Sequence, residues 1–240
     1  MPYADANGIR LYYEELGRGE PLVLVMGIGA QLVLWPDGFC EELARRGFRV
    51  IRFDNRDVGL STKLSEAGVP HPARSLSLGL LGLPVEAPYD LVDMADDVAG
   101  LLDALGLARA HVAGCSLGGM VAQTVALAHP HRVATLTSIM STPGGRRNSL
   151  AKPAALAALL AAAPRSEEDT VAWYVRFFRA VGGKGFAFDE DFVRNAARAA
   201  YRRSHDPRGF ARQLAAMMKT GDRRGALRFV RAPTLVLHGS

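Results

Sequence analysis

Apolar residues in the first part of the chain follow two different patterns. Alternate positions from 9 to 14 are apolar, as in a half-buried strand, and Asn7-Gly8 just before them favours a tight hairpin turn. Residues 22–26 are instead continuously apolar, which is typical of a strand buried on both faces of a sheet, and residues 48–53 form the next strand. We therefore predict an antiparallel hairpin followed by two strands of a parallel sheet.

Apolar residues that recur every three to four positions predict helices between the strands. Residues 90–105 show this period, and Gly106 closes the helix. Residues 63–88 hold four prolines and several glycines, so we predict a long loop there that can include a helical turn. The other predicted elements of this part are a helix at 35–47, a strand at 110–115, a helix at 118–129 and a strand at 133–140.

The alternation of strands and helices stops after Ser141. Residues 150–219 have a helical pattern almost throughout, and a helix at 222–230 and a strand at 233–238 follow. Breaks in the helical stretch are predicted near Pro164, Gly182–Gly185 and Pro207. We therefore expect a parallel α/β sheet interrupted by a helical insertion. Because the insertion follows the end of a strand, it is placed to cover an active site as a lid. The predicted division is a core of residues 1–142, a helical cap of residues 143–220 and a resumed core of residues 221–240.

Composition limits the class of protein. The chain has 240 residues, of which 49% are hydrophobic, and no apolar run approaches the length of a membrane span. Its first residues lack the basic segment and apolar core of a secretory signal. Cys40 and Cys115 are too few for a disulfide framework, so we expect free thiols. These features predict a cytoplasmic globular protein with no membrane partner.

The net charge of +5 is unevenly distributed. Residues 143–232 hold 18 Lys and Arg against 8 Asp and Glu, whereas the rest of the chain holds 11 against 16. A basic half can indicate nucleic-acid binding. Here the arginines are spread along helical segments between alanines and leucines, and no nucleic-acid motif accompanies them. We therefore predict solvated helix surfaces and no nucleic-acid partner.

The hexapeptide of residues 114–119, Gly-Cys-Ser-Leu-Gly-Gly, carries the clearest chemical signal of the chain. It lies between a predicted strand and a predicted helix, which is the setting of a nucleophile elbow. Glycines leave room for such a tight turn, because they have no Cβ to clash. The serine then stands clear of the sheet beside the free N–H groups of the helix N-terminus, where a developing negative charge is stabilised. Ser116 is therefore our candidate nucleophile.

Four ordered motifs resemble those of the α/β-hydrolase superfamily, and the likeness covers essentially the whole chain. The motifs are the glycine-rich loop at 26–29, the segment Asp-Asn-Arg-Asp-Val-Gly-Leu-Ser at 54–61, the elbow at 114–119 and the strand at 233–239. Met26 replaces the common histidine before Gly27, and Asp57 replaces a glycine. Both departures are similar to the branch that includes the aclacinomycin methylesterases.

The resemblance implies an α/β-hydrolase fold with a helical cap, and hydrolysis of carboxylic esters through an acyl-enzyme on Ser116. It also implies an oxyanion hole built from the backbone N–H groups of Leu117 and Ile28, with Gly27 in the oxyanion loop. No cofactor and no metal are implied. The expected partner is a small, apolar ester substrate.

In the superfamily, the acid and the histidine of the triad follow a strand like the one at 233–239. Residues 1–240 hold neither group after that strand, and Ser141-Thr142 occupy the other place where some members carry the acid. We therefore expect both groups beyond residue 240. We also expect the last strand, as an edge with unpaired N–H and C=O groups, to make an isolated 1–240 chain prone to self-association.

Alternatives remain open at this level. Without a base, the chain would be a catalytically inactive module that binds a small molecule, and a cofactor-free perhydrolase would use the same site. Trp173 and Phe177 are spaced to share a helix face, where they line a substrate pocket or form the core of the cap. A dinucleotide loop at 27–29 is disfavoured, because Leu32 stands where a third glycine belongs.

Overall fold

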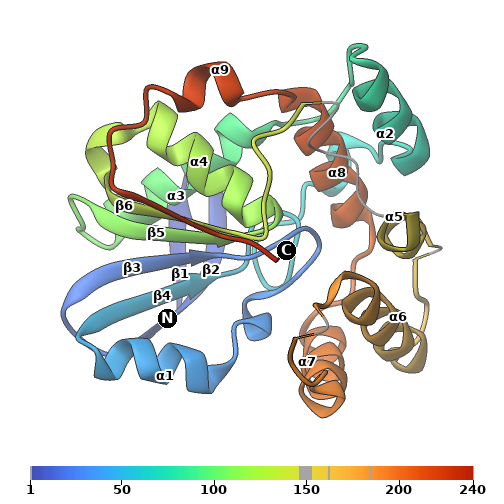
Figure 1. The fold of residues 1–240 in the computed structure, drawn as a ribbon, viewed down its shortest axis with the longest axis horizontal. Coiled ribbons are helices and arrows are strands. Elements are labelled where there is room, and N and C mark those ends of the chain that lie inside the picture. The colour runs from blue at the N-terminus through green and yellow to red at the C-terminus, as the bar shows by residue number, and fades with distance from the viewer. Residues whose placement is uncertain (1, 146–152, 162, 184, 240) are drawn as a thin grey trace.

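The computed structural model describes residues 2–145, 153–161, 163–183 and 185–239. Within these residues, the centre is a seven-stranded sheet in the order β1-β2-β4-β3-β5-β6-β7 (Figure 1). The strands are β1 (Tyr3–Ala6), β2 (Ile9–Leu16), β3 (Glu20–Val25), β4 (Phe48–Phe53), β5 (Ala110–Cys115), β6 (Val133–Ile139) and β7 (Thr234–Leu237). β2 runs antiparallel to β1 and β4, and the other neighbours are parallel. The predicted α/β sheet with an N-terminal hairpin is confirmed.

Helices cover both faces of the sheet (Figure 1). α1 (Asp37–Arg45) packs on one face, and α3 (Leu91–Ala104) and α4 (Leu117–Ala128) pack on the other. α3 begins with a capping box, in which the side chains of Asp90 and Asp93 each accept a backbone N–H at the start of the helix. These helices confirm the three predicted for this part of the chain, with ends shifted by one or two residues.

One helix lies where a loop is predicted. α2 (Pro72–Leu81) has Pro72 in its first turn, where a missing N–H costs no hydrogen bond, and it ends at Gly82 in the left-handed region (φ 69°). The prediction of a loop over residues 63–88 is therefore wrong for this stretch, because proline in a first turn starts a helix rather than breaking one. Conversely, α9 (Arg224–Leu227) spans only four residues of the helix predicted at 222–230.

Helices α5 to α8 follow β6 in the chain. They are α5 (Pro153–Leu159), α6 (Glu167–Val181), α7 (Glu190–Arg203) and α8 (Arg208–Thr220). Together with α2 they stand on the right of the sheet in Figure 1, beyond the carboxyl ends of its parallel strands. The helical pattern predicted for 150–219 is confirmed in the described residues, and its residues 150–152, 162 and 184 lie outside them. The division into a core and a cap at residues 143 and 220 stays a prediction.

β7 is the outer strand of the sheet, next to β6 alone among the described strands. Leu235, Val236 and Leu237 are 52%, 66% and 46% exposed. This strand thus presents an unpaired edge and an apolar surface, which are the features behind the predicted self-association of an isolated 1–240 chain. That behaviour stays a prediction.

Candidate active site

The turn between β5 and α4 holds Ser116 in a strained conformation. Ser116 has φ 55° and ψ −119°, in the left-handed half of the map that side chains other than glycine seldom adopt. The surrounding glycines make this possible. A Cβ at Gly114 would overlap the carbonyl oxygen of Gly118, and a Cβ at Gly118 would overlap that of Val25. The geometry is that of a nucleophile elbow.

The backbone of Ser116 is fixed while its hydroxyl is free within the described part of the chain. The Ser116 N–H donates to Ile139 O at 2.9 Å, and its carbonyl oxygen accepts the Ser141 hydroxyl at 2.7 Å. Ser116 is exposed, and its Oγ has no hydrogen-bond partner among the described residues. A Cβ placed on Gly27 would lie 3.8 Å from Ser116 Oγ. The predicted nucleophile and the predicted oxyanion loop are therefore neighbours.

The predicted oxyanion loop is a tight turn, and the N–H groups of Ile28, Gly29 and Ala30 differ in their partners. The Ala30 N–H donates to Gly27 O at 3.2 Å, and the Gly29 N–H donates to Gln213 Oε1 at 2.7 Å. The Ile28 N–H, which precedes both of these groups in the chain, has no partner among the described residues. It is the donor that the resemblance implies for the oxyanion hole.

The second predicted donor belongs to the first residue of α4. The Leu117 N–H has no acceptor one turn earlier and no other partner in the described part of the chain, as is usual at a helix start. The positive end of the α4 dipole lies at the same place, so negative charge beside Ser116 is favoured. Within the described ranges, each predicted oxyanion donor is thus left free by the fold.

Asp54 links the loop after β3 to the loop after β4. Its side chain is fully buried, and its carboxylate accepts the N–H groups of Leu32 at 2.8 Å and Leu60 at 2.9 Å. Burial raises the pKa of Asp54, against the opposing effects of the Arg203 cation and of these N–H groups. A Cβ at Gly59 would overlap this carboxylate, so the glycine of the segment 54–61 is required by packing.

A buried ion pair joins α8 to the segment after β4. Arg212 donates to both carboxylate oxygens of Asp57, at 2.9 and 2.7 Å, and neither side chain has accessible surface. The Tyr89 hydroxyl donates to the same carboxylate at 2.8 Å. Asp57 has φ 70°. The aspartate that replaces a family glycine therefore has a partner on the predicted cap, which the sequence alone did not reveal.

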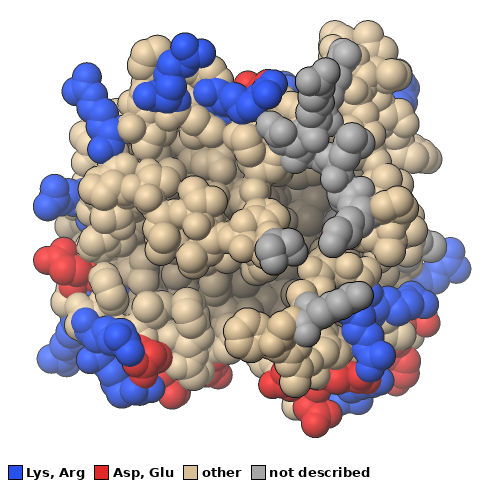
Figure 2. All heavy atoms as spheres, in the orientation of Figure 1, with Lys and Arg blue, Asp and Glu red and all other residues tan. Residues whose placement is uncertain are grey.

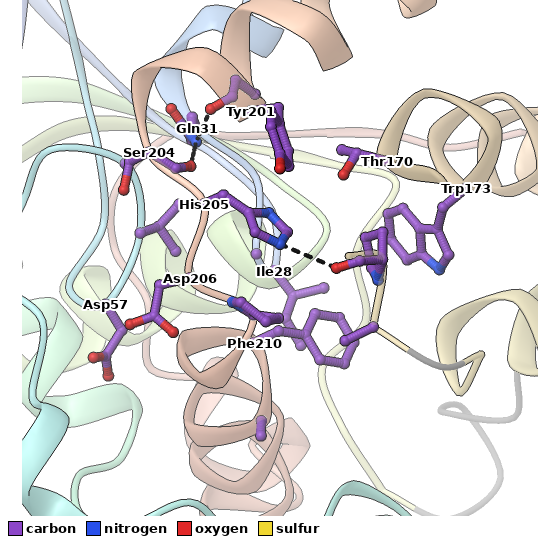
Figure 3. A pocket seen from close by; sticks show the side chains of 18 of the residues that line it. Ile28, Gln31, Asp57, Thr170, Trp173, Tyr201, Ser204, His205, Asp206 and Phe210 are labelled. Atoms are coloured by element: carbon purple, nitrogen blue, oxygen red, sulfur yellow. Dashed lines mark hydrogen bonds between the residues drawn. The ribbon is translucent and has the colours of Figure 1, made fainter. Parts of the chain in front are cut away.

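A cavity of about 190 Å³ lies between helices α6, α7 and α8 and the predicted oxyanion loop, and Leu160 and Pro164, which follow α5, also line it. Figure 2 shows a hollow in the middle of this face, with charged side chains mostly toward the periphery. Figure 3 shows the aromatic side chains of Trp173, Tyr201 and Phe210 around the cavity, with Ile28 on the side of the oxyanion loop. Ser116 is not itself among the lining residues, but it lies next to Gly27, one residue before Ile28.

The two predicted substrate-binding residues separate in the structure. Trp173 lines the cavity, and its Nε1 donates to Ala158 O at 3.0 Å. Phe177 does not line it, but stacks on the Trp173 ring with centroids 5.3 Å apart and planes 3° apart. Tyr201, His205 and Phe210 also line the cavity, and none of them is among the predicted substrate-binding residues. Their only signal in the sequence is their position beside the helix break near Pro207.

None of the six histidines, all of which lie in the described residues, hydrogen-bonds to Ser116. His205 lines the cavity, where its Nε2 is 3.0 Å from Pro164 O (Figure 3). A carbonyl only accepts, so Nε2 carries the proton. His129 pairs with Asp96, and His111 with Thr135.

The described residues contain no group of three or more His, Cys, Asp or Glu arranged to hold a metal ion. No described helix is both long enough and apolar enough to span a membrane. Gly27-Ile28-Gly29 is followed by a short 3-10 turn at Leu32–Leu34, and not by the long helix of a dinucleotide site. Burial raises the pKa of the Cys115 thiol, next to Ser116, to about 11.

Together these features define an α/β protein with a serine on a strained strand-to-helix turn, beside two backbone N–H groups that have no partner in the described ranges. The chain belongs to the alpha/beta hydrolase fold family, whose sequence profile matches residues 20–240. Membership confirms the superfamily that the four sequence motifs resemble.

Two relatives illustrate the likeness in sequence. Over 139 residues the chain is 35% identical to the putative carbamate hydrolase RutD of Azorhizobium caulinodans, covering 58% of this chain and 44% of that protein. Over 134 residues it is 34% identical to the rhodomycin D methylesterase DauP of Streptomyces sp. strain C5, covering 55% and 39%. The matched region is less than half of each relative. The methylesterase agrees with the predicted branch.

Two solved structures illustrate the likeness in fold. A hydrolase from Pseudomonas aeruginosa PA01 is 28% identical with a TM-score of 0.67, covering 99% of this chain and 79% of that one. The enol-lactonase from Burkholderia xenovorans LB400 is 25% identical with a TM-score of 0.69, covering 100% and 81%. The similarity in fold therefore extends over nearly all of the present chain.

Proposed function

We propose that this chain belongs to a serine hydrolase that cleaves small carboxylic esters through an acyl-enzyme on Ser116. The observation that carries the proposal is the elbow itself. Ser116 has a fixed, strained backbone, and its Oγ is free among the described residues. It lies beside Gly27, whose loop and the α4 N-terminus each offer an N–H with no partner in that part of the chain. A carbonyl carbon at Oγ would place its oxygen near both donors.

In the proposed reaction, Ser116 Oγ attacks the ester carbonyl carbon while a histidine takes the hydroxyl proton. The resemblance assigns this histidine, and the acid that orients it, to positions beyond residue 240. The Ile28 and Leu117 N–H groups stabilise the tetrahedral oxyanion. The C–O bond to the alcohol then breaks, and the leaving alkoxide receives the proton. Water attacks the acyl-serine with the same base and frees the acid.

The names of the relatives support the class of bond. The carbamate, methyl ester and enol-lactone in these names each contain a carbonyl carbon bonded to a heteroatom leaving group. An oxyanion hole acts on this shared element. The cavity beside Ile28 fits a compact apolar group, because its walls include Trp173, Phe210 and several alanines.

Ser116→Ala tests this proposal in the full-length protein. Hydrolysis of p-nitrophenyl acetate and labelling by a fluorophosphonate should both fall to background, because each needs the serine oxygen. Ser77→Ala, an exposed serine of α2, is the matched control and should keep parent values. A Ser116→Ala variant that hydrolyses the ester at the parent rate would refute the proposal.

A binding module is the second outcome that the same experiment can identify. It would show no labelling of Ser116 in the full-length parent, with saturable binding of an ester in the cavity.

Peracid formation from acetate and hydrogen peroxide, lost in Ser116→Ala, would identify perhydrolase activity at the same serine.

A further inference from the structure

A buried glutamine of α8 holds the oxyanion turn. Gln213 has no accessible surface, and its Oε1 accepts the Gly29 N–H at 2.7 Å across 184 residues of sequence. Its Nε2 donates to Arg56 O at 2.9 Å. One side-chain amide therefore joins the turn after β3 to the segment after β4.

The two partners fix the direction of this amide. A backbone N–H only donates and a carbonyl only accepts, so the oxygen of Gln213 faces Gly29 and its NH2 group faces Arg56. The helix that carries it is also held in place. Arg212, the preceding residue, is paired with Asp57. Gln213 thus provides the turn with a rigidly mounted acceptor.

The turn also packs closely against Phe210 of α8, which leaves no room for a side chain at Gly29. Gly29 has φ 64°, and a Cβ at this position would lie 2.9 Å from Cδ2 of Phe210. Phe210 and Gln213 are three residues apart and therefore share one face of α8. The turn is packed against this face and hydrogen-bonded to it.

The bond to Gln213 decides which N–H of the turn stays free. It uses the Gly29 N–H, the Gly27 carbonyl uses the Ala30 N–H, and the Ile28 N–H is left without a partner in the described chain. Without the Gln213 oxygen, the Gly29 N–H would be unsatisfied, which favours rotation of the turn toward another acceptor. Such a rotation would move the neighbouring peptide that carries the Ile28 N–H.

We propose that Gln213 is a positioning residue of the oxyanion hole, which holds the Ile28 N–H in place for the oxygen of an ester attacked by Ser116. This inference rests on the proposed function. Gln213 does not line the cavity, so it acts through the turn rather than on the substrate. Preorganised donors lower the barrier only while their geometry is held, and a misplacement of about 1 Å costs on the order of 100-fold in rate.

The test compares Gln213→Met and Gln213→Glu with Gln123→Met in the full-length protein. Gln123 is the matched control, because it is a buried amide of α4 whose partners are Ser138 and Arg223, outside the oxyanion turn. The readouts are kcat and KM for p-nitrophenyl acetate and Ki for a trifluoromethyl ketone, whose serine adduct carries an oxyanion.

We expect Gln213→Met to lower kcat about 10- to 100-fold with little change in KM, and to raise Ki by a similar factor. Gln213→Glu should lose less, because a carboxyl oxygen still accepts the Gly29 N–H. Gln123→Met should keep the parent kcat and Ki. Parent values in a folded Gln213→Met variant would overturn the proposal, as would a loss of kcat without a rise in Ki or equal losses in the Met and Glu variants.

A second readout needs neither turnover nor a folded Met variant. Hydrogen exchange of the Gly29 amide should be slow in the parent protein, because the N–H is bonded to a buried acceptor. Rapid exchange there would overturn the role of Gln213 even if Ser116 is the nucleophile. Conversely, parent activity in Ser116→Ala would refute the proposed function while slow exchange of Gly29 still supports the contact itself.

Discussion

At the scale of single residues, the elbow depends on the absence of a Cβ atom in its glycines. A non-glycine residue held at positive φ costs about 1–3 kcal/mol, so the surroundings must enforce the conformation of Ser116. Gly114 and Gly118 do so by letting the start of α4 approach β5 and the end of β3 more closely than any Cβ would allow. Each glycine of the sequence motif therefore has a steric reason in the fold.

We predict that Gly118→Ala destabilises the protein by about 3 kcal/mol, because the new methyl group would overlap the Val25 carbonyl oxygen. Gly38→Ala is the control. It lies in the first turn of α1 with open space around its Cβ, so alanine there should leave the stability unchanged or raise it by less than about 1 kcal/mol. Urea unfolding measures both, and equal midpoints for the two variants would contradict this account of the elbow.

The thiol beside the proposed nucleophile should be unreactive. Burial raises the pKa of Cys115 to about 11, so the thiolate is scarce at pH 8 and increases as the pH rises toward that value. Against a free thiol of pKa about 8.5, alkylation by iodoacetamide at pH 8 should be roughly 100-fold slower. Peptide mass spectrometry would measure the rate, with urea-unfolded protein as the control. Labelling of folded Cys115 at the unfolded rate would refute the prediction.

At the scale of elements, α8 is a bridge between the helices that follow β6 and the loops of the sheet. Arg212 and Gln213 reach the segment after β4, and Gln213 also reaches the turn after β3. A Cβ at Gly209 would overlap the Asp57 carbonyl oxygen, so the helix start lies directly against that segment. Helix α8 therefore behaves structurally as part of the core, although it lies in the predicted cap.

We predict that Arg212→Met destabilises the protein by about 3–5 kcal/mol, because it leaves the Asp57 carboxylate buried without its partner. Adding Asp57→Asn should recover part of the loss, since asparagine removes the charge and tolerates positive φ. Arg208→Met, one turn earlier and paired with Asp206 at the surface, should cost less than about 1 kcal/mol. Similar losses in the Arg212 and Arg208 variants by urea unfolding would show that burial does not govern this pair.

The order of the elements was predictable, because the local spacing of apolar residues distinguishes strands from helices. Alternation identified β2, a continuous apolar run identified β3, and helical spacing identified α3. The hydrogen bonds that hold the site were not predictable. Gln213 and Gly29 are 184 residues apart, and a polar residue on an apolar helix face says only that some buried partner exists. In hindsight, Gln213 was detectable, since it is three residues after Phe210 and one before Leu214, on the apolar face of its helix.

At the scale of the whole molecule, the cavity belongs to no single element. Its wall combines the turn after β3, the segment after β4 and parts of α6, α7 and α8. Sequence patterns could place Trp173 on a helix. Only the structure shows that Trp173 lines the cavity while Phe177 stacks on the Trp173 ring and does not line it. A substrate group in this space would touch both the sheet side and the helices that follow β6.

This arrangement predicts how a change in the cavity wall alters substrate choice. Trp173→Leu removes an aromatic surface from the wall, so KM for a phenylacetyl ester should rise about three- to tenfold relative to KM for the acetyl ester. Trp35→Leu is the matched control, because the other tryptophan of the chain stacks on Phe39 of α1 and does not line the cavity. Both variants should lose stability, so thermal unfolding is measured beside the kinetics. If Trp35→Leu shifted the ratio of the two KM values as much as Trp173→Leu, the change would reflect general loosening of the fold, and the cavity would not be the place where the acyl group binds.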